Sequence, residues 1–196
     1  LEQSTGLALA ETECCEIYYY ETSAAWLDIE AIIAEADREA EAAIQKMQVD
    51  FTEPITMLLM PRVLGHGGFA GGELYISYLD RNYAGDSLES VLHHEMIHEL
   101  DRRAGGEFRP TMLVEGLAVY HSGGHFKKEP IYPRAAALLH LGWYIPLPTL
   151  AEGFYFQQHE ITYLQAAALV EYMVERWGYE AFDAFYRDIT PPVDGE

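Results

Sequence analysis

Two histidines four positions apart, with a glutamate between them, stand out in the segment His94-Glu95-Met96-Ile97-His98. On a helix such residues share one face, so His94 and His98 could bind the same metal ion. Imidazole nitrogens are common zinc ligands, and a catalytic zinc site has three protein ligands and an open position for water. Glu95 would be the general base. The segment therefore predicts one Zn²⁺ per chain and hydrolytic chemistry.

The third ligand must lie further along the chain, and Glu115 is the best candidate. It is the one carboxylate of the mostly apolar segment 112–120, which predicts a second helix. A buried carboxylate needs a partner. The chain between His98 and Glu115 has room for a loop through Gly105-Gly106 and an antiparallel return. The alternative is a charge that merely favours a helix N-terminus.

These two motifs, His-Glu-x-x-His and then Glu-Gly-Leu-Ala-x-Tyr from Glu115, resemble the gluzincin metallopeptidases. The small bacterial peptidase MA-like domains are the most similar, and aminopeptidase N and the leukotriene hydrolases are more distant. The resemblance implies a zinc metallopeptidase that cleaves peptide bonds with water activated by zinc, with His94, His98 and Glu115 as ligands and Glu95 as base. The tryptophan that usually precedes the ligand glutamate is replaced by the apolar segment 112–114.

A later segment, 161–173 followed by Trp177-Gly178, is similar to the gluzincin helix that begins with an active-site tyrosine. Tyr163 occupies the matching position. The resemblance implies that its O–H donates to the oxyanion formed in the transition state. The alternative is ordinary packing, because the chain has 14 tyrosines.

The order of elements that must position these residues indicates an α+β fold. Hydrophobic patterns predict strands at 17–20, 54–60 and 73–78, and helices at 24–47, around the two histidines and at 179–188. We predict a loop at 143–158. The resemblance makes the fold zincin-like, with an edge strand of a small mixed sheet over the active-site helix and a helical C-terminal half.

The strand at 73–78 is predicted to be that edge, where free backbone groups could pair with an extended peptide. The glycine-rich segment 67–72 before it is either a lip of the cleft or an ordinary loop. Both interpretations fit the sequence equally well.

Length and charge limit the domain organisation and the partners. The 196 residues, of which 49% are hydrophobic, predict one domain over 1–196 with peripheral tails at 1–14 and 190–196. A net charge of −20 repels nucleic acid and anionic lipid. No apolar run approaches the length of a membrane span. We expect a peptide or protein substrate; the oligomeric state is not indicated, and only the family resemblance implies an extracytoplasmic location.

Three other groups have simpler interpretations. His121 and His125 are also four apart, but the two glycines between them would break a helix. His93 lacks a partner at helical spacing and is predicted to be packed or solvent-facing. Cys14 and Cys15 are adjacent, so they cannot join distant parts of the fold, and a bond between neighbours is rare. We predict two small residues entering a strand.

Glu99 and Asp101 are the candidates for holding a ligand imidazole by its second nitrogen, and the sequence does not choose between them. Two alternative functions use the same metal. One is a catalytically silent, zinc-stabilised domain that binds peptide or acts as a scaffold, which the presence of Glu95 argues against. The other is a zinc hydrolase of a non-peptide substrate.

Overall fold

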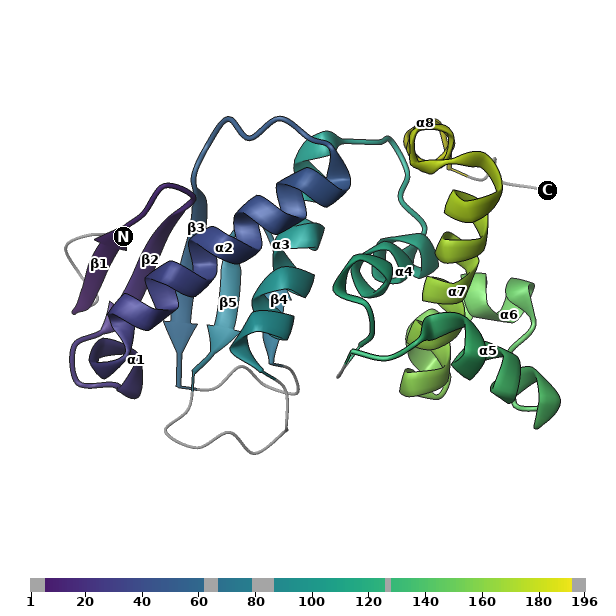
Figure 1. Cartoon of the computed structure of the whole chain (residues 1–196), viewed down its shortest axis with the longest axis horizontal. Helices are drawn as coiled ribbons and strands as arrows, with labels where there is room; N and C mark the ends of the chain where they lie inside the picture. Colours follow the sequence, from purple (N-terminus) through teal and green to yellow (C-terminus); the bar gives the residue numbers. More distant parts are fainter. Residues whose placement is uncertain (1–5, 62–66, 79–86, 126–127, 192–196) are drawn as a thin grey trace. The chain divides into compact units, whose positions relative to one another are not determined.

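The computed structural model describes residues 6–61, 67–78, 87–125 and 128–191, and the chain divides into two compact units, Leu1–Leu100 and Asp101–Glu196. The boundary falls within helix α3 (Leu88–Ala104). The first unit contains the sheet and the second is helical, which confirms the α+β class (Figure 1). The single-domain organisation stays a prediction. No described helix is long and apolar enough to cross a membrane.

Five strands form a mixed sheet in the described part of the first unit, in the order β1-β2-β3-β5-β4. They are β1 (Leu7–Glu11), β2 (Cys15–Tyr20), β3 (Ile55–Met60), β4 (Gly68–Ala70) and β5 (Leu74–Ser77). The three inner strands are parallel, and β1 and β4 are antiparallel edges. Within the predicted N-terminal tail, residues 7–11 form β1, which pairs along its whole length with β2.

The edge next to β5 is β4, so the prediction that 73–78 forms the edge strand is wrong. β5 lies between β3 and β4 and is paired on both sides. The glycine-rich segment contains the edge itself at Gly68–Ala70, and Gly71 N–H donates to the carbonyl of Glu73 over 3.0 Å in the turn that follows. The segment is therefore not an ordinary loop throughout, and its role as a lip of the cleft stays a prediction.

One face of the sheet is apolar because alternate residues of a strand point to the same side. Pairing places Ile17, Met57 and Leu74 in one row across β2, β3 and β5, and all three are fully buried. Helix α2 (Ile29–Met47) crosses the sheet (Figure 1). Its buried residues recur at helical spacing, at Ile32, Ala36, Ala40, Ala43 and Met47. A short α1 (Ala24–Leu27) precedes it, so the predicted helix 24–47 is interrupted at Asp28.

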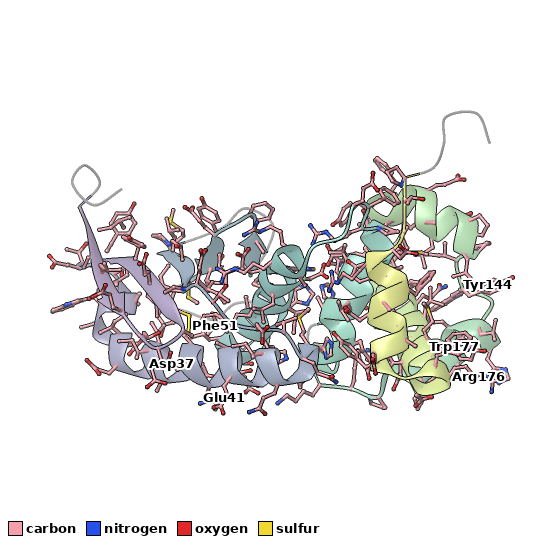
Figure 2. The ribbon with its side chains drawn as sticks, turned by 90° about the horizontal axis from the view of Figure 1, so that it is seen from above. Asp37, Glu41, Phe51, Tyr144, Arg176 and Trp177 are labelled. Carbon is pink, nitrogen blue, oxygen red and sulfur yellow. A yellow bond between two sulfur atoms is a disulfide. The ribbon has the colours of Figure 1, made fainter. Side chains whose placement is uncertain are left out.

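The opposite side of α2 is polar. Glu41 is exposed and points away from the sheet (Figure 2). Gln45 donates to it over 3.1 Å, a pair at the i, i+4 spacing that supports a helix. Apolar residues on one side and such pairs on the other explain why this segment is helical.

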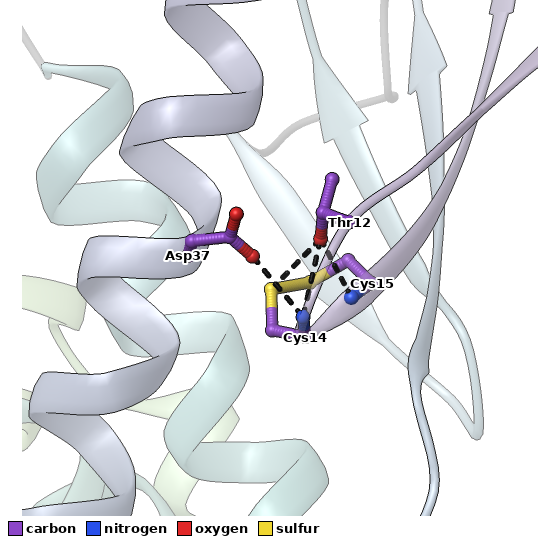
Figure 3. The surroundings of a disulfide bond; sticks show 4 residues. All are labelled: Thr12, Cys14, Cys15 and Asp37. Atoms are coloured by element: carbon purple, nitrogen blue, oxygen red, sulfur yellow. Dashed lines mark hydrogen bonds between the residues drawn. A yellow bond between two sulfur atoms is a disulfide. The ribbon is translucent and has the colours of Figure 1, made fainter.

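Cys14 and Cys15 form a disulfide with each other, which corrects the prediction of two unbonded residues (Figure 3). Both are buried, Cys14 directly before β2 and Cys15 as its first residue. Thr12 Oγ1 accepts from the backbone N–H groups of Cys14 and Cys15 over 3.2 and 2.9 Å, and Asp37 of α2 accepts from Cys14 N–H over 3.1 Å. These contacts attach the connection between β1 and β2 to α2.

The described elements of the second unit are all helices. Its elements are α4 (Thr111–Ser122), α5 (Ile131–His140), α6 (Leu147–Gly153), the 3-10 turn η1 (Phe154–Phe156), α7 (His159–Trp177) and α8 (Tyr179–Arg187). The predicted loop 143–158 is thus partly helical. Pro148 in the first turn of α6 is consistent with this, because proline lacks only an N–H that would have no partner there. The predicted C-terminal tail lies outside the described residues from position 192.

The end of α3 is attached to α8 through the buried carboxylate of Asp101. Arg109 Nη1 and Tyr186 Oη donate to its Oδ2 over 3.0 and 2.9 Å, and Arg187 Nη1 donates to Oδ1 over 2.6 Å. Arg187 also donates to the carbonyl of Gly105 over 2.8 Å, just after α3 ends. Burial, together with the Asp101 charge, raises the pKa of Tyr186 above its ordinary range. This cluster of buried polar groups links the end of α3 to α8 within the second unit.

Candidate metal centre

Helix α3 brings the two histidines of the motif together. Ser87 Oγ accepts from Ser90 N–H over 3.2 Å at the start of this helix. The Nε2 atoms of His94 and His98 lie 3.0 Å apart, and their rings are nearly perpendicular. Both side chains are half-buried. Two imidazole nitrogens therefore converge on one point, as the spacing predicted.

Glu95 lies against the edge strand. Its side chain is 8% exposed. A Cβ atom on Gly68 of β4 would lie 2.6 Å from Glu95 Cγ and 2.9 Å from Oε1, so only glycine lets the strand approach this closely. The edge strand β4, at Gly68, and the side chain of Glu95 are thus neighbours within the first unit. An extended chain paired with β4 would pass close to a buried base.

His93, next to the motif, joins α3 to α2. Its Nδ1 lies 3.0 Å from Glu39 Oε2, and Lys46 Nζ lies 3.2 Å from its Nε2. An ammonium group only donates, so Nε2 accepts and Nδ1 donates to Glu39. Burial raises the pKa of Glu39, and the charges of Glu89 and Glu35 add to this effect. His93 is therefore a packed histidine, as predicted, and its ring helps to fix the orientation of α3.

Glu115 belongs to α4 in the second unit and is buried, at 7% exposed. Tyr155 Oη donates to its Oε1 over 2.6 Å. This is the kind of partner that a buried carboxylate requires. Sequence reasoning did not find it, because Tyr155 is 40 positions away in a segment that was predicted to be a loop.

Tyr163 lies on α7, the helix that packs against α4. A Cβ atom on Gly116 would lie 2.6 Å from the carbonyl oxygen of Ala166, so the two backbones are in contact there. Tyr163 is one turn before Ala166 on the same face of α7, and Gly116 directly follows Glu115. The structure thus places Glu115 and Tyr163 on adjoining helices of one unit.

Two histidines that carried no predicted role surround Tyr163. His125 stacks on its ring with the centroids 3.9 Å apart, and His159 lies 4.4 Å away. His159 and Tyr163 are four residues apart on α7, so helical spacing could have signalled this pair, whereas His125 lies beyond the end of α4 and shares no element with them. His121 instead packs against Tyr179, and α4 ends at Ser122, so the two glycines separate His121 from His125 as predicted.

Asp101 and Glu99 were the two options for supporting a ligand imidazole. Both oxygens of Asp101 accept hydrogen bonds from Arg109, Tyr186 or Arg187, which commits this carboxylate to the second unit. Glu99 is 1% exposed within the first unit, which also contains His94 and His98. Which of the two carboxylates supports a ligand imidazole stays a prediction.

Comparison of the chain with protein-family models finds no match, and comparison with curated proteins finds none either. The chemical interpretation therefore rests on the residues and contacts described above.

Proposed function

We propose that this chain is a zinc-dependent metallopeptidase of the gluzincin type, with a zincin-like arrangement of sheet and active-site helix. The observation that carries the proposal is the convergence of His94 and His98 Nε2 atoms, 3.0 Å apart on α3, beside a buried Glu95. A site that only stabilised the fold would have no use for a base at that position.

Glu115 is the third ligand in this proposal. Two imidazoles and one carboxylate are a donor set that could hold a metal ion, and Zn²⁺ accepts both kinds of donor. Three protein ligands would leave the fourth position open, as catalytic zinc sites require. When bound, zinc supplies a Lewis acid that polarises a carbonyl and lowers the pKa of water.

The residues of the chain then have separate tasks. The backbone of β4 pairs with the extended substrate and holds the scissile bond near Glu95. Glu95 takes a proton from the attacking water and passes it to the leaving amine. Tyr163 donates its O–H to the oxygen that becomes negative as the water attacks.

Elemental analysis combined with peptide cleavage tests the proposal. Wild type should contain about one zinc per chain and cleave an unbiased peptide pool, and a chelator should stop the cleavage. His98→Ala and Glu115→Ala should lose both zinc and cleavage. The matched controls are His140→Ala and Glu152→Ala, which remove exposed residues of the same types from α5 and α6 and should change neither.

Glu95→Gln separates catalysis from metal binding. The variant should keep zinc and lose about 10²–10⁴-fold in turnover, because an amide cannot accept the proton. Zinc without any peptide cleavage in wild type would favour the binding or scaffold function, and cleavage of non-peptide esters or amides alone would favour the other hydrolase. Absence of zinc in wild type would refute all three functions.

A further inference from the structure

The hydrogen bond between Tyr155 and Glu115 has no part in the chemistry proposed so far. It joins α4 to the 3-10 turn η1 over 2.6 Å. Hydrogen bonds to an ionised oxygen are shorter and stronger than neutral ones, and O–H donors reach about 2.5–2.7 Å in such bonds. The distance is thus typical of a phenol that donates to a carboxylate.

The turn that carries Tyr155 is itself held in place. Phe154 is 3% exposed, and its ring contacts Tyr155 edge-on at 5.3 Å and Tyr163 at 5.1 Å. Leu150 of α6 is fully buried in the same hydrophobic core. The amide of Gln165 on α7 exchanges two hydrogen bonds, of 2.6 and 2.9 Å, with the backbone of Ile145 before α6. The Tyr155 hydroxyl is therefore presented to Glu115 from a fixed support.

A carboxylate has two oxygens, and the phenol takes Oε1. Metal ligation through Oε2 would keep the hydrogen bond, because one carboxylate accepts at both atoms. Groups that hydrogen-bond to a metal ligand orient it, and their loss typically weakens metal binding by about 10–100-fold. We propose that Tyr155 is a positioning residue that orients Glu115 for Zn²⁺ through this hydrogen bond. The inference rests on the proposed zinc centre.

Packing alone does not account for the hydroxyl. Tyr155 is 63% exposed as a residue, whereas its hydroxyl bonds to the buried carboxylate of Glu115. Tyr155→Phe removes that one atom and leaves the ring against Phe154. The matched control is Tyr144→Phe, which removes a hydroxyl from another exposed tyrosine of the same unit (Figure 2).

The experiment measures metal binding rather than activity. Zn²⁺ is titrated against a chelating indicator, and Co²⁺ binding is followed by visible absorption, for wild type and both variants. Tyr155→Phe should bind Zn²⁺ roughly 10-fold more weakly or worse, and its Co²⁺ spectrum should change. Tyr144→Phe should match wild type. In a Glu115→Ala background, Tyr155→Phe should have no further effect on residual Co²⁺ binding.

Activity gives a second readout. If Tyr155 acts only through Glu115, peptide cleavage by Tyr155→Phe should return to nearly the wild-type kcat when Zn²⁺ is saturating. Wild-type Zn²⁺ affinity in Tyr155→Phe would overturn the inference and leave the proposed function intact. The inference would also be overturned if Tyr155→Phe weakened metal binding as much in the Glu115→Ala background as it does in the wild-type background. A wild-type chain that binds no Zn²⁺ would overturn both proposals together.

Discussion

Gly116 of α4 and Ala166 of α7 are in backbone contact, with room for no side chain between them. A Cβ atom at position 116 would lie 2.6 Å from the Ala166 carbonyl oxygen and 2.8 Å from its carbonyl carbon. Real Cβ atoms do not approach backbone so closely, and a helix backbone cannot move aside as a side-chain end can. The glycine therefore sets the distance between the helices that carry Glu115 and Tyr163.

Gly116→Ala should destabilise the chain because α4 and α7 must separate. Overpacking of this kind costs about 1–3 kcal/mol. Chemical denaturation followed by circular dichroism measures the loss. Gly153→Ala is the control, since a Cβ atom there would meet only Gln157 Nε2, at 3.6 Å. Equal stabilities for the two variants would contradict the close packing of these helices.

Gly68→Ala should act on catalysis more than on stability. The new Cβ atom would lie 2.6 Å from Glu95 Cγ and 2.9 Å from its Oε1, so it would push the Glu95 side chain away from its position. A displacement of about 1 Å in a catalytic group can cost roughly 10²-fold in rate, so we expect a loss of that order in kcat with zinc content unchanged.

The control for Gly68→Ala is Gly71→Ala, whose Cβ atom would meet the ring of Phe69 instead of Glu95. It should keep most of the activity. Comparable rate losses in both variants would mean that the glycine-rich segment 67–72, rather than the position of Glu95, determines the loss of kcat.

Asp101→Asn should reduce the free energy of unfolding by roughly 3 kcal/mol, because it leaves the buried guanidinium of Arg187 with only the more exposed Asp183 as a counter-charge. The Asp101 side chain is 1% exposed and that of Arg187 is 16% exposed. Urea denaturation measures the change. Asp183→Asn removes a more exposed partner of Arg187 on α8 and should cost only about 0–1 kcal/mol. If Asp101→Asn left the free energy of unfolding unchanged, the cluster would make no net contribution to stability.

The raised pKa of Tyr78 predicts that the chain loses stability at high pH. The Tyr78 hydroxyl donates to Asp28 Oδ2 over 2.8 Å, and burial, with that hydrogen bond and the Asp28 charge, raises the pKa of Tyr78 from 10.0 to about 12. The folded chain holds this proton more tightly than the unfolded chain. The stabilisation is therefore complete below pH 10 and is lost as the pH rises to about 12.

Unfolding free energies of wild type and Tyr78→Phe, measured from pH 9 to pH 12, test the Tyr78 prediction. The stability advantage of wild type should shrink across this window. The comparison is needed because burial also raises the pKa values of Tyr179 and Tyr186, which both proteins share. A constant difference between the two proteins would rule out the Tyr78 contribution.

Local periodicity made several features predictable from the sequence. The i, i+4 spacing of His94 and His98 specifies their convergence wherever the helix lies, because helix geometry is set by backbone hydrogen bonds within the segment. Hydrophobic patterns predicted strands at the positions of the three inner strands, and the apolar surroundings of Glu115 indicated a buried carboxylate. The sequence shows that Glu115 is separated from other charges along α4. It does not show that Tyr155 is the hydrogen-bond partner of Glu115.

Tertiary structure alone decided which residues meet across long separations. The pairing of β5 on both sides, the contact of Gly68 with Glu95 and the hydrogen bond from Tyr155 to Glu115 join segments with no shared periodicity. The same holds for the engagement of Asp101 by α8. Such contacts depend on strand order and on how closely helices pack, and these are properties of the whole core rather than of any one segment.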